Sequence, residues 1–158
     1  MPITPIRVRR ATCDDAPTIA HFNISMAKET EDKELLPDVV KAGVLTLLQH
    51  KELGFYLVAE SEGKLVGSLM ITTEWSDWRN GIFWWIQSVY VEPNSRRKGA
   101  FRALYQEVEK LSKEESNVCG YRLYVEKENL AAQAVYRSLG LEETHYRLFE
   151  KEVDPRQS

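Results

Sequence analysis

The stretch VYVEPNSRRKGAFRAL, residues 89–104, joins an apolar segment to a helical one through three cations and a glycine. Cations at the first turn of a helix are locally unfavourable, because they meet the positive end of the helix dipole. That turn also leaves backbone N–H groups without intrahelical acceptors, and Gly99 lacks a side chain that would keep an anion from them. Arg96, Arg97 and Lys98 beside Gly99 therefore predict an anion-binding site.

Two common nucleotide-binding loops do not account for this site. The sequence is neither GxxxxGK[ST] nor GxGxxG, so it fits neither a P-loop nor a Rossmann dinucleotide site. A basic surface loop that uses glycine as a turn residue is the other interpretation. One glycine alone does not decide between the two.

Outward from this stretch, the hydrophobic periodicity predicts an α/β domain with a mixed sheet. Strands are expected at 6–11, 54–61, 64–75, 82–91, 120–127 and 145–153. Helices are expected at 12–29, from Pro37 onward, at 99–115 and at 129–140. Glu62-Gly63 is a hairpin signal, and Asn129 and Gly140 are placed to begin and end the last helix. A single domain, 1–158, is expected, with 154–158 as a flexible tail.

Composition narrows the class of protein. With 158 residues, 43% hydrophobic and 28% charged, the chain is typical of one soluble globular domain. A formal net charge of -3 argues against a nucleic-acid partner, and no apolar run approaches the roughly 20 residues of a membrane span. Cys13 and Cys119 lack a CxxC spacing, which favours free thiols in the cytoplasm and no metal site. The N-terminus also lacks the apolar stretch of a signal peptide.

Residues 89–104 resemble the acyl-CoA-binding motif of the GNAT superfamily of N-acetyltransferases, a hydrophobic strand followed by [QR]-x-x-G-x-[GA] at the start of a long helix. Arg96 takes the first position and Gly99 that of the glycine, whereas Phe101 stands where the family usually has Gly or Ala. ENLAAQAVYRSLGL, 128–141, resembles the family's N-x-x-A-x-x-x-Y-x-x-x-G-[FL] helix. Together the motifs extend the resemblance over nearly the whole chain.

The resemblance implies the GNAT fold, a mixed central sheet of about six to seven strands, splayed at the CoA site and flanked by four helices. In the family, pantetheine lies between the two splayed strands and the diphosphate lies on the N–H groups that open the helix. The cosubstrate implied is acetyl-CoA, and no metal is implied. The cofactor-binding residues implied are Val89, Tyr90, Val91, Arg96, Arg97, Lys98, Gly99, Ala100, Phe101, Arg102 and Asn129.

The implied reaction is acetyl transfer to a primary amine by direct attack. Tyr136 matches the family tyrosine that protonates the departing thiolate, and a phenol pKa of about 10 lies near a thiol pKa of about 8.5. Packing against CoA is its alternative role. Where the family often has a glutamate base, this chain has Trp85 and Gln87, so Glu74 is the candidate base. A water chain held by Gln87 and Ser88 is the alternative, and the Val89 N–H is the candidate for polarising the carbonyl.

The acceptor, a small-molecule or peptide amine, is less well defined. The acid-rich run KETEDKE, 28–34, and the tryptophans near Glu74 would suit a cationic amine. A solvated charge run and packed sheet aromatics are the competing interpretation. The missing strand glutamate keeps a non-catalytic acyl-CoA-binding module as the alternative function, and a homodimer is one option for assembly.

Overall fold

The computed structural model describes residues 5–154, and the chain divides into two compact units, Met1–Tyr124 and Val125–Ser158. The first unit holds the sheet and three α-helices, and the second holds one α-helix. The single domain predicted for 1–158 stays a prediction. Of the predicted flexible tail, residues 155–158 lie outside the described part of the chain.

All the predicted elements except the strand at 145–153 are found at nearly the predicted places. The strands are β1 (Arg7–Arg10), β2 (Phe55–Ser61), β3 (Lys64–Ser76), β4 (Gly81–Val91) and β5 (Val118–Leu123). The α-helices are α1 (Ala16–Glu31), α2 (Pro37–Gln49), α3 (Ala100–Glu114) and α4 (Leu130–Ser138). Four α-helices and a mixed sheet confirm the predicted fold class, and the sheet has five strands among the described residues instead of about six to seven.

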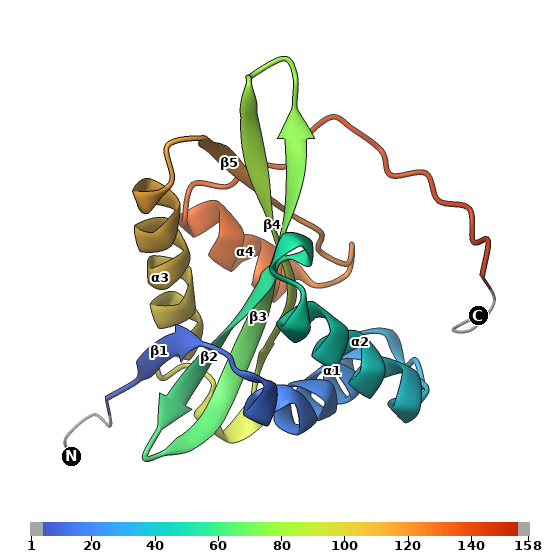
Figure 1. Ribbon diagram of the computed structural model, residues 1–158, viewed down its shortest axis with the longest axis vertical. Coiled ribbons are helices and arrows are strands. Elements are labelled where there is room, and N and C mark those ends of the chain that lie inside the picture. The colour runs from blue at the N-terminus through green and yellow to red at the C-terminus, as the bar shows by residue number, and fades with distance from the viewer. Residues whose placement is uncertain (1–4, 155–158) are drawn as a thin grey trace. The chain divides into compact units, whose positions relative to one another are not determined.

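The sheet has the strand order β1-β2-β3-β4-β5 (Figure 1). Each neighbouring pair is antiparallel except β4 and β5, which run parallel. The β2–β3 hairpin turns at the predicted Glu62-Gly63, where φ is 54° and 75°. Two left-handed residues in succession give the turn twist that joins antiparallel strands tightly.

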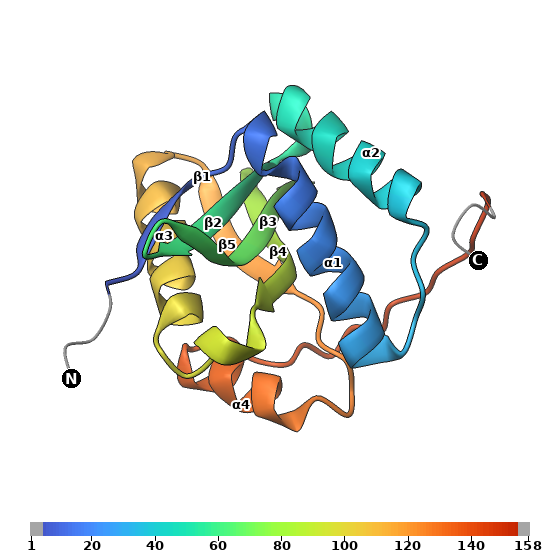
Figure 2. The same cartoon turned by 90° about the horizontal axis from the view of Figure 1, so that it is seen from below.

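Helices cover both faces of the sheet. In Figure 2, α3 lies on one side of the strands, and α1 and α2 lie on the other. The α1–α2 face is closed by Ala16, Ile19, Ala20, Val44, Leu47, Tyr56 and Val58. On α3, Leu104 and Val108 are fully buried. Burial of each such side chain contributes roughly 1.5–3 kcal/mol, so the two faces fix the sheet between the helices.

The parallel strands β4 and β5 separate before β4 ends. Their pairing runs from Ile82 opposite Val118 to Ile86 opposite Leu123. In the last five residues of β4, 87–91, Gln87, Tyr90 and Val91 pair with β3, Ser88 and Val89 lie in the irregularity between them, and none pairs with another described strand. Ser88 has a φ of 51°, where the β3–β4 register shifts. Because β5 ends at Leu123, one edge of β4 has no described strand beside it at residues 87–91, which is consistent with the predicted splay.

The prediction of a strand at 145–153 was wrong. Residues 139–154 form no strand or helix, and several of their large apolar side chains are exposed, among them Leu148 and Phe149. An alternating pattern makes a strand only where a second strand pairs with its N–H and C=O groups. No described strand pairs with this segment.

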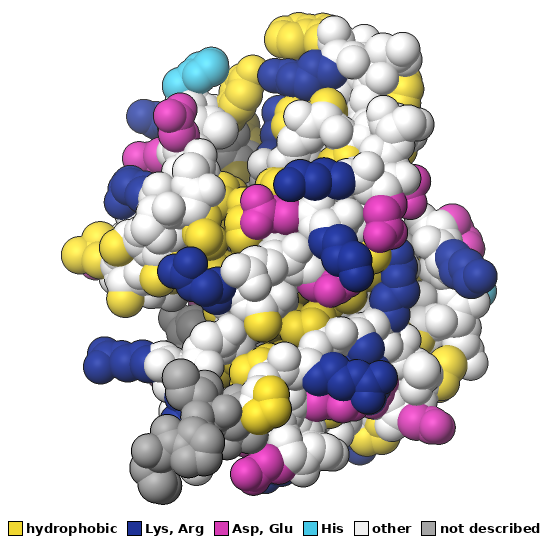
Figure 3. All heavy atoms as spheres, turned by 90° about the vertical axis from the view of Figure 1, so that its left-hand side faces the viewer, with side chains coloured by type: hydrophobic (Ala, Val, Ile, Leu, Met, Phe, Trp, Pro, Cys, Tyr) yellow, Lys and Arg dark blue, Asp and Glu magenta, His cyan; other side chains and the backbone are white. Residues whose placement is uncertain are grey.

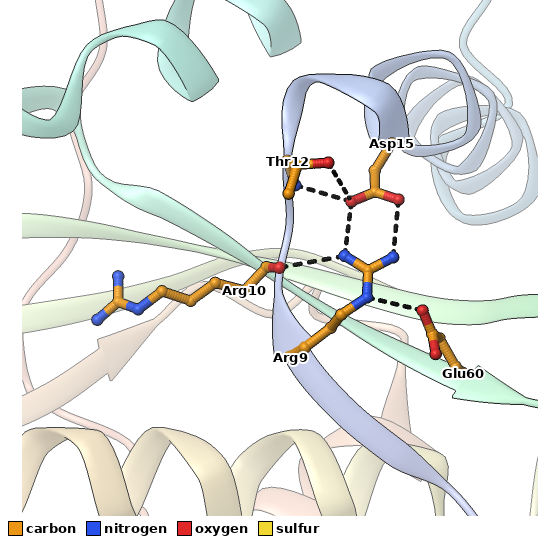
Figure 4. A network of polar contacts seen from close by, with 5 residues as sticks. All are labelled: Arg9, Arg10, Thr12, Asp15 and Glu60. Atoms are coloured by element: carbon orange, nitrogen blue, oxygen red, sulfur yellow. Dashed lines mark hydrogen bonds and ion pairs between the residues drawn. The ribbon is translucent and has the colours of Figure 1, made fainter.

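A polar network joins β1 to the start of α1 (Figure 4). Arg9 Nη1 and Nη2 donate to Asp15 Oδ2 and Oδ1 at 2.8 and 3.0 Å, and Arg9 Nε donates to Glu60 Oε1 at 2.7 Å. The Thr12 N–H donates to Asp15 Oδ2 at 2.8 Å. The hydrogen bonds from Arg9 hold the pKa of the Asp15 carboxyl below its usual value, although burial opposes the shift. The network fixes the start of α1 relative to β1 and β2.

Candidate functional site

The anion site was predicted in the loop between β4 and α3. After a single 3₁₀ turn at Pro93–Ser95, Arg97 and Gly99 adopt left-handed φ values of 63° and 89°, and α3 begins at Ala100. A Cβ added to Gly99 would meet nothing within 4 Å. The backbone conformation therefore favours glycine, and the space beside the helix start is open.

The helix start presents backbone donors. The N–H of Ala103 donates to the Gly99 carbonyl at 2.9 Å, which is the first bond of the helical ladder. The N–H groups of Ala100 and Arg102 come before that bond, and glycine at the N-cap has no side chain to accept from them. At Phe101, where the family motif has a small residue, the ring centroid lies 6.2 Å from that of Tyr105. A helix start of this kind binds anions through its N–H groups and its dipole.

Arg96, the first cation of the loop, is paired within the chain. Its Nη1 and Nη2 atoms donate to Glu29 Oε1 and Oε2 on α1 at 2.6 and 2.9 Å. Its Nε donates to the Val91 carbonyl at 2.8 Å, and its guanidinium carbon lies 5.6 Å from the Tyr90 ring centroid. Arg96 holds the pKa of the Glu29 carboxyl below its usual value. Arg97 and Lys98 are exposed, so they are the loop cations available to a ligand.

A second group of polar side chains lies on the ends of β3, β4 and β5. Glu74 Oε1 accepts hydrogen bonds from Trp85 Nε1 at 3.0 Å and from Arg122 Nη1 at 2.7 Å. The Arg122 guanidinium carbon lies 3.8 Å from the Phe83 ring centroid. The Trp85 ring centroid lies 4.7 Å from that of Tyr124. The candidate base is therefore a member of a fixed ion-paired cluster.

Arg122 and Tyr124 were not predicted as site residues. Arg122 lies on β5 and Tyr124 just beyond its end, and the alternation in YRLY, 121–124, is the only signal the sequence offers for them. Their partners depend on the parallel register that sets Arg122 opposite Trp85, and short-range patterns do not give that register.

The other residues considered near the acceptor are more dispersed. Trp84 is buried against Phe55, whereas Trp85 is on the opposite face of β4, so the tryptophans form no single group. Gln87, considered as a water-holding residue, donates to Thr72 Oγ1 at 2.7 Å. In the acid-rich run, Lys28 pairs with Asp32 and Glu34 at 2.8 and 3.1 Å. Part of the acidic charge of the run is thus compensated, by Lys28 within it and by Arg96 on Glu29 from outside it.

In the second unit, α4 begins and ends as predicted. The Asn129 Oδ1 accepts from the Ala132 N–H at 3.1 Å, and Gly140 has a φ of 91° just after the helix. The Leu141 N–H donates to the Tyr136 carbonyl at 3.1 Å, which closes the helix end. Tyr136 is partly buried, and this burial raises the pKa of its hydroxyl above the usual value. The hydroxyl is therefore protonated at neutral pH, as a proton donor must be.

The remaining features of the described residues are their surface charge, their cysteines, and the search for metal-binding groups and membrane-spanning helices. On the face drawn in Figure 3, Lys and Arg side chains are interspersed with Asp and Glu. Cys13 and Cys119 are exposed free thiols. Within residues 5–154, no three His, Cys, Asp or Glu side chains gather in a way that could hold a metal ion. Every helix described there is too short or too polar to span a bilayer.

Comparisons with known proteins agree with this geometry. A family model described as the acetyltransferase (GNAT) family matches residues 18–141. A solved structure described as a possible acetyltransferase from Clostridium difficile 630 is 49% identical, with a TM-score of 0.87 over 94% of this chain and 98% of that chain. A comparison with curated proteins gives no match.

Two more distant structures share the fold. One is described as a predicted acetyltransferase with acetyl-CoA from Clostridium acetobutylicum, 18% identical with a TM-score of 0.76 over 93% of this chain and 96% of that chain. The other is an aminoglycoside N-acetyltransferase in complex with CoA, 17% identical with a TM-score of 0.72 over 96% of this chain and 97% of that chain.

Proposed function

The chain belongs to the GNAT family of acetyltransferases, so its reaction class is acyl transfer, and we propose that it moves an acetyl group from acetyl-CoA to a primary amine. The observation that carries this proposal is the start of α3. Gly99 leaves open space beside a helix N-terminus, and Arg97 and Lys98 stand exposed next to it. Open space at a helix start beside two exposed cations favours a diphosphate-binding site over a basic surface turn.

The residues proposed to hold acetyl-CoA follow the chain from β4 into α3. On β4 the proposed residues are Val89, Tyr90 and Val91, with the backbone of Val89 and Val91 pairing with the amides of the pantetheine arm. The Val91 carbonyl already accepts from Arg96 Nε at 2.8 Å. The diphosphate is proposed to lie on the N–H groups of residues 97–102, with Arg97 and Lys98 offsetting its charge. Arg96 keeps the loop in place through Glu29. Asn129 stays in the predicted set, although its side-chain oxygen already caps α4.

The proposed chemistry assigns one proton to each of two side chains. Acetyl-CoA, when bound, supplies a thioester whose carbonyl carbon the amine nitrogen attacks. Glu74 is proposed to take a proton from the amine, directly or through water, because Trp85 and Arg122 both bind its Oε1 atom and leave Oε2 to accept it. Tyr136 is proposed to protonate the leaving thiolate, and the Val89 N–H to polarise the carbonyl.

Turnover separates this function from the alternative, a module that binds acyl-CoA without reaction. Purified protein is incubated with acetyl-CoA and panels of polyamines, aminoglycosides, amino acids and peptide N-termini, and free CoA thiol and acetylated product are measured. Amine-dependent thiol release with a matching product supports the transferase. A thermal shift with CoA and no release with any amine would favour the binding module.

We also propose a cellular location for the protein. Two exposed free thiols favour a reducing compartment, and we propose the cytoplasm. A homodimer stays a prediction.

A further inference from the structure

The ends of β3, β4 and β5 form a polar and aromatic surface that α1 and α2 leave uncovered. In Figure 1 the β3–β4 hairpin extends beyond both helices. The strand register puts Glu74 opposite Phe83, and Trp85 opposite both Thr72 and Arg122, so their side chains share one face. On the other face of the same strands, Trp84 and Ile86 are buried.

At the centre of this surface is an ion pair that uses only part of its hydrogen-bonding capacity. Arg122 Nη1 and Glu74 Oε1 are joined at 2.7 Å, with side-chain exposures of 28% and 44%. Among the described residues, nothing donates to Glu74 Oε2 or accepts from the Nε and Nη2 atoms of Arg122. The pair thus offers one anionic acceptor and further cationic donors side by side, without net charge.

The guanidinium group of Arg122 is held against an aromatic ring. Phe83 is 8% exposed, and its ring lies over Gly120, where an added Cβ would come within 2.8 Å of Phe83 Cε1. Arg122 lies over this ring at 3.8 Å, and Arg79 lies over it at 4.9 Å. A guanidinium stacked on a ring keeps its N–H donors at its edge, in the fork geometry that binds a carboxylate.

We propose that this surface binds the acceptor amine, and that the acceptor also carries a carboxylate, as an α-amino acid does. The inference rests on the proposed acetyl transfer. The ammonium binds Glu74 Oε2 and the carboxylate binds Arg122, while Trp85 and Tyr124 contact the apolar part of the acceptor. A polyamine fits less well, because the one carboxylate is already compensated by Arg122.

The proton transfers and bond changes of the reaction use only Glu74, Tyr136, water, the acceptor and acetyl-CoA. The bound ammonium loses a proton to Glu74, and its nitrogen forms the new bond to the acetyl carbonyl carbon. The carbon–sulfur bond breaks, and the thiolate takes the proton of Tyr136. The nitrogen gives up its second proton, through water, to the phenolate left on Tyr136, so the product amide is neutral. The product is an N-acetyl amino acid, whose amide nitrogen is uncharged. It has therefore lost its attraction to Glu74 while it keeps its carboxylate.

The test uses acceptors that differ only in the carboxylate. Each common α-amino acid is compared with its carboxamide and, where it exists, with the amine that lacks the carboxyl carbon. For the preferred side chain, we expect kcat/KM to be roughly 10- to 100-fold higher for the amino acid than for either analogue, as a lost charge-assisted hydrogen bond predicts. A preference for an analogue, a polyamine or an aminoglycoside would overturn the inference and leave acetyl transfer standing.

Matched variants assign the effect to Arg122. Arg122→Gln should remove the preference for the carboxylate, and Arg122→Lys should restore part of it, because charge is kept but the planar fork is lost. Arg79→Gln is the control, since Arg79 stacks on the same Phe83 ring without bonding to Glu74. Equal effects of Arg122→Gln and Arg79→Gln on the preference would reject the assignment. Thermal unfolding of each variant reports loss of fold separately.

Binding distinguishes failure of this inference from failure of the proposed function. Saturation-transfer NMR on the wild-type protein with CoA measures binding of the same amino acids and analogues without requiring turnover. Selective binding of an amino acid that Arg122→Gln abolishes would support the carboxylate site even if no acetylation occurs. Absence of selective binding would reject the site whatever the protein acetylates.

Discussion

Arg96, in the loop before α3, donates two hydrogen bonds to Glu29 on α1, 67 residues earlier in the chain, at 2.6 and 2.9 Å. The pair joins the helix that covers one face of the sheet to the loop at the end of β4. A cation that the sequence places beside a ligand is therefore engaged by a carboxylate of the chain itself. Arg97 and Lys98, which are exposed, are the loop cations left to offset the charge of the proposed diphosphate.

If the Glu29–Arg96 pair positions the loop, its two side chains act as a unit. Glu29→Ala and Arg96→Ala should each weaken CoA binding, measured by calorimetry, and the double variant should be little worse than either one. The coupling in folding free energy should be about 0.5–1 kcal/mol, because both side chains are substantially exposed. Glu31→Ala, in the same acidic run, is the control. Tighter CoA binding by Glu29→Ala would show instead that Glu29 competes with the ligand for Arg96.

Gly99→Glu should abolish the thermal shift produced by CoA, because its carboxylate enters the space proposed for the diphosphate. The φ of 89° costs a side chain roughly 1 kcal/mol, and no neighbour blocks the new Cβ, so the variant should fold. Gly99→Ala carries the same backbone cost without the charge and is the matched control. An undiminished CoA shift in Gly99→Glu would place the diphosphate elsewhere.

Tyr136→Phe removes the hydroxyl and keeps the ring. Loss of a general acid should lower kcat roughly 10²–10⁴-fold, with little change in the KM for acetyl-CoA. Because burial raises the pKa of this hydroxyl, the proton donor is present throughout the neutral range. Activity that depends on it should fall only above about pH 10, the ordinary value for tyrosine. Tyr146→Phe is the control, and wild-type turnover by Tyr136→Phe would leave Tyr136 as a packing residue.

Glu74→Gln isolates basicity from position. The amide oxygen can still accept from Trp85 and Arg122, but the side chain no longer takes a proton. We expect kcat/KM to fall mainly near neutral pH and to recover in part at higher pH, where more of the acceptor is already neutral. The measurement is the pH–rate profile with one fixed acceptor. A profile superimposable on that of the wild type would favour a water chain at Gln87 and Ser88.

Asp15→Asn should destabilise the fold by about 1–3 kcal/mol, because it breaks charged hydrogen bonds with Arg9. The pKa of Asp15 is lowered in the folded state. Its contribution is therefore complete above the unfolded pKa of about 3.9 and is lost as pH falls through the lower folded pKa. Denaturant unfolding from pH 6 to pH 2 should show a smaller acid-dependent loss in Asp15→Asn. Asp14→Asn, which alters an exposed neighbour, should leave that slope unchanged.

Local features of the fold were predictable because they depend on residues close in sequence. The Glu62-Gly63 turn, the Asn129 cap and the helix after Gly99 each follow from backbone preferences within a few positions. The strand expected at 145–153 had the right alternation, but a strand also needs a partner, which the pattern does not supply. The motif from Arg96 to Arg102 identified the family for the same local reason.

The candidate site was only partly predictable, because its decisive contacts span the chain. Arg122 meets Glu74 across two strand pairings, one of them parallel, and a shift of one residue in either would separate them. Glu29 reaches Arg96 through the packing of α1 on the sheet. Charge composition indicated that acids and bases were present, but only the register and the packing determine which ones meet.

The open edge of β4 at residues 87–91 also bears on how the protein behaves in solution. A strand with unpaired N–H and C=O groups is a template for any other extended chain, which is the origin of edge-to-edge aggregation. A pantetheine arm in the proposed position would occupy that template. Cosubstrate would then act as a solubilising agent as well as a reactant, and protein stripped of it would be the form most prone to self-association.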